Sequence, residues 1–403
     1  MKKLLRVFVL AALAVAFTFV SCDDDDNGNG NGNNNDTPKK ENNLLSGSVT
    51  STMQLSADIE YQLTGPLIVE EGGVLEIPAG TVIKAQKGFS KYILVLQGGK
   101  INARGTAEKP IKMIGDKENA GEGYWGGLVI NGRAPLADPA EKGSTEVNSA
   151  YTYGGNNPSD NSGVITYLIL GNTGARSSAD VEHNGLTLNG VGNGTKIENL
   201  YIYDGADDGI EFFGGSVNVK NLLVVNSDDD MFDFTQGYNG TLENAYGIWE
   251  VGYVSSESDP RGIEADGNLD GKFKDHPNQS NFTVKNMTIE LKLAAVNDAE
   301  AAAKAAPYKY MHDVIKLRRG ANATIINALV KGVGTAKDLV DVTDGKGDGD
   351  TRAKISLTNA LTSNIIGKEI NTPEGSSYPD VKIEKGNSGC PTNIFDWTGY
   401  KFN

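Results

Sequence analysis

The chain has 403 residues, of which 50 are glycine, and its formal net charge is −15 at pH 7. This acidity excludes binding to nucleic acid through the phosphates, which requires a basic surface. The sequence contains two cysteines, Cys22 and Cys390. Since Cys22 is expected to carry a lipid, Cys390 has no partner within the chain, and no structural disulfide is predicted.

Residues 1–22 have the pattern of a bacterial export signal. A start with three basic residues precedes an apolar run over 7–20, which is shorter than an ordinary membrane span. The run ends in Ser-Cys, which resembles a lipobox, although Phe19 departs from the small aliphatic residue usual at that position. We therefore expect lipidation at Cys22 and attachment to a membrane through the acyl chains. A plain secretory signal is the alternative.

Residues 23–43 are predicted to form a disordered tether, because they combine aspartates with glycine and asparagine and have almost no apolar content. The four aspartates at 23–26 resemble the surface-export signal of Bacteroidetes lipoproteins. The expected location is therefore the cell outer membrane, with the protein exposed at the surface. A solubilising spacer is the simpler alternative. The remaining sequence, 44–403, contains no second apolar run long enough to span a bilayer.

Residues 44–115 are expected to form the first coils of a solenoid. Gly-Gly pairs at 72–73 and 98–99 recur between short alternating strands, as do Gly-Thr pairs at 80–81 and 105–106. Glycine permits the positive φ angles that coil corners require. Residues 116–163 are rich in Gly, Pro, Asn and Ser, and we predict a loop excursion there. Long loops in compact proteins often carry function.

An asparagine followed by a β-rich run recurs in the second half of the chain. The recurring residues are Asn199, Asn221, Asn244, Asn286, Asn327 and Asn359, at spacings of 22, 23, 42, 41 and 32 residues. A step near 22 residues is one coil of a parallel β-helix, and we predict an all-β, right-handed parallel β-helix over residues 44–403. The asparagines are expected to stack at one corner and to hydrogen-bond along the stack, which needs no ligand.

Two segments depart from the repeat. The alanine-rich residues 293–306 predict a small helical insertion that lengthens one coil. The chain becomes irregular after residue 360, and solenoids require a cap at the open end of the core. We expect the cap to be formed by Phe395, Trp397, Tyr400 and Phe402.

A second strand recurs in each coil, with apolar residues on either side of an outward middle position. The middle positions expected to stack on one sheet are Thr187, Glu211, Asp233, Glu264, Lys316 and Asp341. A second column lies three residues earlier, at Asn184, Asp208, Asp230, Arg261, Asp313 and Asp338, with Asp207 and Asp229 beside it. Neighbouring coils are about 4.8 Å apart, so these carboxylates should form one acidic cluster.

Two interpretations of this cluster remain open. Aspartates before each strand can accept backbone N–H groups at a tight corner, as Asx turns do. Alternatively, the carboxylates hold calcium, which prefers six to eight oxygen ligands, or they line a saccharide groove. Corner geometry does not require acidic residues at positions 211 and 233. On the second interpretation, the ligand-binding residues are Glu211, Asp233, Arg261 and Glu264.

The pairs Asp207-Asp208 and Asp229-Asp230 resemble the stacked aspartates of polygalacturonase-type β-helix hydrolases, in which carboxylates of adjacent coils act as acid and base. The resemblance makes these four residues the catalytic candidates. The chain has no Gly-His-Gly segment and no clear Arg-x-Lys clamp, so hydrolysis is not the leading prediction. A β-eliminating lyase would need calcium and a basic side chain, for which Arg261 is the candidate. Pairing with the aspartates is the simpler role for Arg261.

A second candidate for calcium follows in the chain. Asp266, Asn268 and Asp270 match the front half of an EF-hand loop, D-x-N-x-D-G. Pro277 stands where that loop needs its bidentate glutamate. Calcium binding by these three residues is the functional interpretation, and a solvated turn is the simpler one.

Several glycine- and aspartate-rich segments together carry a family resemblance. They are Gly126–Ile130, Gly154–Asn156, Asn161–Gly163, Asn184–Gly192, Asp207–Gly215 and Asp229–Asp233. They resemble a family of secreted β-helix lipoproteins that occurs in Bacteroidetes and includes proteins similar to a leptospiral outer-membrane lipoprotein. The resemblance covers roughly residues 45–403 and implies the pectin-lyase-like fold and a place in the cell envelope. It implies no established activity, so no catalytic residue is carried over.

The leading function prediction is a lipid-anchored cell-envelope β-helix that contacts glycans without cleaving them, with a polysaccharide as the candidate partner. The cofactor is left open, and calcium is the candidate. A polysaccharide-degrading hydrolase or lyase that uses the stacked aspartates is the first alternative. A structural or adhesive envelope protein is the second.

Overall fold

The computed structural model describes residues 43–178, 181–296 and 308–402. The chain from Asn43 onward forms one compact unit. The predicted signal at 1–22, its lipidation site Cys22 and the tether at 23–43, apart from Asn43, lie outside the described residues. Among the residues that the structure describes, no helix has the length and apolar character needed to cross a bilayer.

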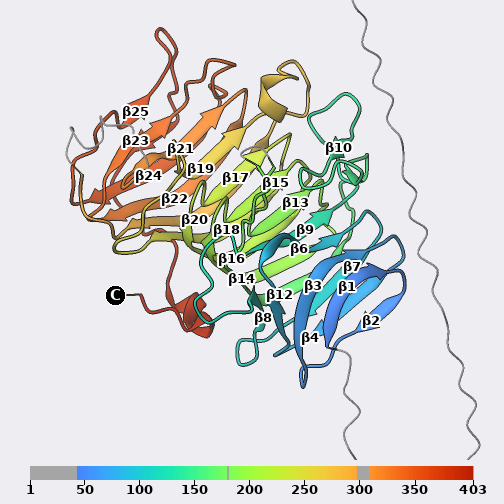
Figure 1. Ribbon diagram of the computed structural model, residues 1–403. Helices are drawn as coiled ribbons and strands as arrows, with labels where there is room; N and C mark the ends of the chain where they lie inside the picture. Colours follow the sequence, from blue (N-terminus) through green and yellow to red (C-terminus); the bar gives the residue numbers. More distant parts are fainter. Residues whose placement is uncertain (1–42, 179–180, 297–307, 403) are drawn as a thin grey trace, which may run out of the picture. The chain divides into compact units, whose positions relative to one another are not determined.

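The strands wind in successive coils and pair in parallel from coil to coil (Figure 1). A strand of one coil is hydrogen-bonded to the equivalent strands of the coils before and after it, as β14, β16 and β18 illustrate. This arrangement confirms the right-handed parallel β-helix that the sequence predicts. Apart from a short hairpin-like pair, the described strands belong to one sheet, which forms two long ladders.

The first ladder, here called the corner ladder, consists of β12 (Gly163–Gly171), β14 (Lys196–Gly205), β16 (Asn218–Ser227), β18 (Thr241–Trp249), β20 (Asn281–Leu291), β22 (Asn322–Gly332), β24 (Lys354–Leu361) and β26 (Val381–Ile383). In the first coils, two series of shorter strands precede β12, and each series pairs with one half of it. The first series is β2 (Thr52–Gln54), β4 (Val74–Pro78) and β7 (Lys100–Arg104). The second series is β5 (Val82–Ala85) and β8 (Ile111–Gly115).

The second ladder, here called the site ladder, consists of β1 (Leu44–Val49), β3 (Glu60–Val69), β6 (Gly88–Val95), β9 (Trp125–Asn131), β13 (Leu186–Asn189), β15 (Ile210–Phe213), β17 (Phe232–Thr235), β19 (Arg261–Asp266), β21 (Met311–Arg318), β23 (Ala336–Asp341) and β25 (Ile370–Asn371).

Apolar side chains fill the interior of the coils, because side chains alternate between the two faces of a strand. In the site ladder, the residues that flank each middle position are fully buried, as Ile210 and Phe212 are in β15. Phe212, Phe234 and Phe282 stack through the interior, with ring centroids 5.1 and 4.2 Å apart. Burying each such side chain contributes about 1.5–3 kcal/mol to folding.

The stacked asparagines form the predicted corner. Five of them have φ angles between 54° and 60°, a left-handed conformation that asparagine adopts more readily than most residues. Each amide Nδ2 donates to the Oδ1 of the preceding asparagine at 2.8–2.9 Å, which confirms the ladder through Asn199, Asn221, Asn244, Asn286 and Asn327.

Asn359 does not join this ladder, although its sequence pattern is the same. The pairing of β22 with β24 shifts register between Ile325 and Ala328, and Asn359 therefore lies opposite Val330. Its Oδ1 accepts the backbone N–H of Leu361 instead. The prediction of a sixth stacked asparagine was wrong, because the repeat changes register in this coil.

Residues 116–163 leave the coils only in part, because β9 pairs with β6 and β13 within the site ladder. Beyond it, β10 (Gly143–Ser144) and β11 (Thr152–Tyr153) form a small antiparallel sheet. We call residues 132–162 the flap. Several hydrogen bonds tie the flap to the site ladder and the turns beside it, among them two between side chains. Asn131 Nδ2 donates to Thr145 Oγ1 at 2.7 Å, and the Tyr153 hydroxyl donates to Gln236 Oε1 at 2.8 Å.

The helical insertion predicted at 293–306 falls largely outside the described residues. Residues 293–296 are described and are not helical. Two short 3-10 helices are present elsewhere, η1 (Leu269–Gly271) and η2 (Asn393–Thr398).

The prediction that the C-terminal aromatic residues cap the end of the core was wrong. They cover the outer face of the corner ladder. Phe395, which is fully buried, and Phe402 contact Tyr246, and Trp397 packs edge-on against Tyr167 with 5.3 Å between ring centroids. The outward side chains beneath this segment are apolar and include Leu223, Val225, Tyr246 and Ile248. An apolar face of this extent requires a cover. We call residues 390–402 the strap.

Candidate functional site

The outward positions of the site ladder stack in the predicted register. Direct neighbours in adjacent coils are Thr187 and Glu211, Glu211 and Asp233, Asp233 and Glu264, Glu264 and Lys316, and Lys316 and Asp341. These side chains lie outside the apolar interior but are largely buried. The flap lies close to them, since burial and the nearby charge of Glu211 both raise the pKa of the flap residue Tyr153.

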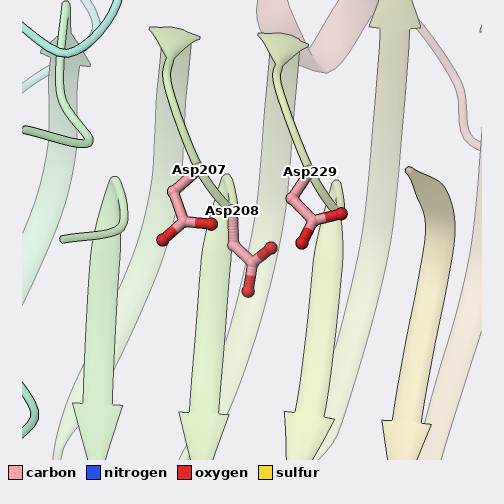
Figure 2. A group of neighbouring side chains, drawn as sticks. All are labelled: Asp207, Asp208 and Asp229. Carbon is pink, nitrogen blue, oxygen red and sulfur yellow. The ribbon is translucent and has the colours of Figure 1, made fainter. Parts of the chain in front are cut away.

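The turns that enter β15 and β17 add further carboxylates to this face. Asp207 and Asp208 lie on one turn and Asp229 on the next, and Figure 2 shows Asp208 between the other two. One carboxylate oxygen of each of these three residues lies within 4.8 Å of the others. Three further triplets of described residues meet the same limit; two of them connect to the first through Asp208 and Asp233, and the fourth, Asp313, Asp338 and Asp341, shares no member with the others. Together the three connected triplets form one continuous group, the carboxylate cluster, of Asp207, Asp208, Glu211, Asp229, Asp230, Asp233 and Glu264.

Burial raises the pKa of the carboxyl groups at the β15–β17 end of the cluster. The pKa of Asp229 rises to about 7 and that of Asp233 to about 8. Burial, reinforced by neighbouring carboxylates, raises the pKa values well above the usual range for the remaining members near β15 and β17, namely Asp207, Asp208, Glu211 and Asp230. Like charges at this spacing disfavour one another's ionisation unless a cation or a donor intervenes.

Several oxygens of the cluster have no donor. Asp229, Asp230 and Asp233 each carry a buried Oδ1 that has no hydrogen-bond partner in the described part of the chain. The side chain of Asp230 is only 3 % exposed, so water does not readily satisfy it. A buried acceptor without a partner costs about 1–3 kcal/mol, and more when it is charged.

The structural interpretation of the second column accounts for two of its aspartates. Asp208 Oδ1 accepts the N–H of Asp230 at 2.9 Å, and Asp338 Oδ1 accepts the N–H of Lys368 at 2.5 Å. The donor belongs to the next coil and not to the residue's own corner. Asp230 and Asp313 do not follow this interpretation, because the Oδ1 of each is buried and has no hydrogen-bond partner among the residues that the structure describes.

Arg261 is held by carboxylates on every side. Its guanidinium contacts Asp259 and Glu264, lies 3.3 Å from Asp313 Oδ2, and lies 3.8 Å from Asp230 Oδ2. Despite burial, these charges raise the pKa of Arg261 above its ordinary value. The simpler role, pairing with the neighbouring carboxylates, is therefore what the structure shows. A guanidinium in this state is not a general base.

Arg318 lies nearer the cluster than the sequence suggests. Residue counting places it about four coils from the paired aspartates, but β21 pairs directly with β19, and β19 is the second coil after β15. Arg318 contacts Glu264 and donates to Asp266 Oδ1 at 2.5 Å. The segment that precedes β21 inflates the residue count without adding a coil to the ladder. The basic pair Arg318-Arg319, which begins two residues after the outward position Lys316 of β21, was the available signal.

The residues of the EF-hand-like segment are engaged by cations of the chain. Asp266 pairs with Arg318 and Arg319, and Asp270 pairs with Lys346 and Arg319. Asn268 Oδ1 accepts the N–H of Phe273 at 2.8 Å. This geometry contradicts the interpretation as a calcium loop, because guanidinium and ammonium groups occupy the positions that a cation would take.

The carboxylate cluster therefore has two unlike ends. At the β19 end, Arg261 and Arg318 neutralise Glu264. At the β15–β17 end, carboxylates face one another, and three of them have an unsatisfied buried oxygen. Such a set of oxygen donors fits a hard divalent cation, and calcium accepts six to eight oxygens in flexible geometry. Asn184 adds a polar partner, since its Nδ2 donates to Glu211 Oε2 at 2.6 Å.

Comparison with known proteins gives a single kind of match. The Pectate-lyase like beta helix domain matches residues 47–400. Comparison with curated proteins and with solved structures gives no match. Because the domain match spans most of the chain and agrees with the observed coils, the protein belongs to the pectate-lyase-like β-helix domain family.

Proposed function

We propose that the protein is a lipid-anchored module of the cell envelope that holds a calcium ion in its carboxylate cluster and contacts glycans without cleaving them. One observation carries the proposal: Asp229, Asp230 and Asp233 each present a buried oxygen with no hydrogen-bond partner in the described structure, within a group of carboxylates from adjacent coils. Calcium would supply the missing positive charge and would bind several of these oxygens at once.

The surroundings support a cation at the β15–β17 end only. At the β19 end the carboxylates already have guanidinium partners, and the pKa of Arg261 is raised accordingly. At the other end, burial and neighbouring carboxylates raise the carboxyl pKa values of Asp208 and Asp230, although the charge of Arg261 lowers that of Asp230 in part. A bound divalent ion would stabilise the ionised carboxylates and lower those pKa values, since an opposite charge favours the charged form.

A binding role is favoured over cleavage by the state of Arg261. A lyase that works by β-elimination needs a base that can accept a proton, and Arg261 was the candidate. Its guanidinium is engaged by four carboxylates and keeps its proton. The carboxylates themselves are packed so closely that they suit one shared ion better than two separate proton-transfer roles.

The place of the protein in the cell is part of the proposal. The support is the basic start, the short apolar run and Cys22, followed by four aspartates. Labelling with a radioactive or alkyne-bearing fatty acid should modify the chain, and Cys22→Ser should abolish the label. Protease added to intact cells should remove the protein if it is exposed on the outer membrane, and protection would contradict that placement.

Calcium titration tests the cation site. Isothermal titration of the calcium-free chain should detect binding, which the double variant Asp208→Asn/Asp230→Asn should abolish. The exposed Asp58 serves as a matched control, because Asp58→Asn makes the same change far from the cluster and should leave binding intact. Undiminished calcium binding by the double variant would refute the site.

The polysaccharide-degrading alternative rests on a specific observation. Carboxyl groups with pKa values of about 7 and 8, at Asp229 and Asp233, can act as proton donors near neutral pH. Incubation with a panel of polysaccharides distinguishes the two functions. Release of reducing ends or of unsaturated sugars that disappears in Asp208→Asn/Asp230→Asn would establish an enzyme. If the protein neither binds calcium nor retains glycans, the structural or adhesive role is the one that remains.

A further inference from the structure

A second candidate site lies beneath the flap, beside the carboxylate cluster. A cavity of about 390 Å³ opens there between the flap and the outer ends of β9, β13, β15 and β17. Its volume falls in the range of small-molecule pockets, which is about 300–1,000 Å³. The apolar part of its wall includes Val129, Val147, Tyr153, Phe213 and Leu269.

Two buried carboxamides are among the polar groups of this wall. Asn189 is 1 % exposed and Gln236 is fully buried, and both line the cavity. Asn189 Nδ2 donates to Asn131 Oδ1 at 2.9 Å, while Gln236 Oε1 accepts the Tyr153 hydroxyl at 2.8 Å. Asn189 Oδ1 and Gln236 Nε2 have no hydrogen-bond partner among the described residues. Each carboxamide therefore lacks one hydrogen-bond partner: Asn189 lacks an N–H donor, and Gln236 lacks an oxygen acceptor.

The charge around the cavity restricts its ligand. Asp138 and Glu146 line the cavity. Burial is the main cause that raises the pKa of Tyr153, and the charges of Glu211, Glu146 and Asp138 raise it further. Lys142 is the one basic residue among the lining residues. An anionic ligand is disfavoured in this field. An uncharged ring fits the aromatic and aliphatic wall, and an amide group on that ring would offer the N–H and the carbonyl oxygen that the two carboxamides lack.

We propose that this cavity binds one uncharged sugar ring that carries an acetamido group, the chemistry of an N-acetylated amino sugar. The ring would lie against Phe213 and Tyr153, the acetamido N–H would donate to Asn189, and its carbonyl would accept from Gln236. Rotation of a terminal amide torsion, which has a broad energy profile, turns either group toward the ligand. The inference deepens the proposed glycan contact by naming the class of sugar.

Ligand-observed NMR with the purified chain tests this assignment. N-acetylglucosamine should bind, and glucose, which lacks only the acetamido group, should bind at least tenfold more weakly. N-cyclohexylacetamide has the amide but not the sugar hydroxyls, so equal binding of this compound would overturn the sugar assignment. Equal binding of glucose and N-acetylglucosamine would overturn the role of the carboxamides.

Variants locate the site. Val147→Trp places an indole in the cavity from its half-buried edge and should abolish binding. Val251→Trp makes the same change at a valine that is 79 % exposed and outside the cavity, so it should bind normally. Phe213→Ala, which removes part of the wall without filling it, should weaken binding at least tenfold. Retained binding in both Val147→Trp and Phe213→Ala, with unchanged melting temperatures, would refute the cavity as the site.

The two proposals fail separately. Asp208→Asn/Asp230→Asn should lose calcium and keep the sugar, because neither aspartate lines the cavity. Val147→Trp should lose the sugar and keep calcium. Loss of both ligands in either variant would contradict the assignment of two distinct sites.

Discussion

At the scale of single residues, the asparagine ladder was the most predictable feature of the chain. The same residue type at nearly constant spacing indicated a stacked corner, and the side-chain amides of Asn199 to Asn327 do hydrogen-bond in series. The left-handed backbone explains the choice of residue, because asparagine adopts it at low cost while its amide both donates and accepts. Asn359 was not predictable in the same way, because a register shift cannot be read from local sequence.

Replacing a central member of the ladder should be costly. Asn244→Ala removes two hydrogen bonds, to Asn221 and from Asn286, and places alanine at a φ angle of 59°. We expect a loss of about 2–4 kcal/mol in the free energy of unfolding, measured as a lower urea midpoint. Asn359→Ala is the matched control, since it changes the same residue type outside the ladder, and it should cost much less. Equal losses would contradict a special contribution from the stack.

Arg261 shows what residue spacing could and could not reveal. Its position in the column of aspartates was predicted, and so was its simpler role in pairing. The nearness of Arg318 was not predicted, because counting residues treats the long segment between β19 and β21 as more than one coil, although it contains a single strand of the corner ladder, β20. Contacts from a neighbouring coil thus decide the electrostatics of Glu264, and they depend on the three-dimensional register alone.

Removing the Arg261 charge should destabilise the fold strongly. Arg261→Leu leaves the buried carboxylates of Asp230, Glu264 and Asp313 without this partner, and we expect a loss of about 3–5 kcal/mol. Arg352→Leu provides the control, because Arg352 pairs with Asp350 at an exposed site, where such pairs contribute about 0–1 kcal/mol. Urea unfolding of both variants measures the difference. A loss below about 1 kcal/mol in Arg261→Leu would contradict the assigned role.

At the scale of elements, the strands were predicted from the sequence more accurately than the segments between them. Apolar alternation predicts which side chains fill the interior, but it does not tell which outer face also needs a cover. In the second halves of β16 and β18 the outward positions are apolar as well, so these parts of the strands are buried on both faces. The aromatic C-terminal residues were therefore assigned to the end of the core, whereas they form the strap over the outer face of the corner ladder.

The strap should detach without unfolding the coils. Phe395→Ala removes a fully buried ring from the strap, and truncation of a buried phenylalanine costs about 3–5 kcal/mol. We expect faster hydrogen exchange and proteolysis in residues 390–402, together with binding of a hydrophobic dye to the uncovered face, while the circular dichroism of the coils is retained. Phe89→Ala, a phenylalanine substitution in β6, should leave the strap protected. Loss of all β structure in Phe395→Ala would contradict a separable strap.

At the scale of the whole molecule, the repeating coil allows residues that lie together in space to be predicted from their spacing in the sequence. Residues 22 apart become direct neighbours, so the acidic cluster could be predicted from spacing, and Glu211 does lie beside Asp233. Its burial could not be predicted, because alternation along a strand does not tell how deeply an outward side chain lies. The cavity could not be predicted either, because its lining includes residues of the flap, a segment without repeats.

The charge state of the cluster should make stability depend on pH in a direction that calcium reverses. The folded-state pKa values of Asp229 and Asp233, about 7 and 8, lie above those of unfolded aspartates. Such raised values give stability that is fully present below the unfolded pKa and is lost as pH rises through the folded pKa. Burial lowers the pKa of His183 to about 4, which adds stability as pH rises but only up to its unfolded pKa of about 6.5. The window from pH 6.5 to 8 therefore isolates the carboxyl groups.

In that window the melting temperature of the calcium-free chain should fall as pH rises, since each proton that the folded state holds and the unfolded state does not lowers the free energy of unfolding by about 1.4 kcal/mol per pH unit. Excess calcium should raise the melting temperature most at pH 8 and flatten the profile, because the ion takes the place of the protons. Asp208→Asn/Asp230→Asn should show a shallower fall and no response to calcium. A calcium-free profile that rises between pH 6.5 and 8 would mean that the carboxylates are already balanced by charges of the chain, and the cation site would then have no electrostatic basis.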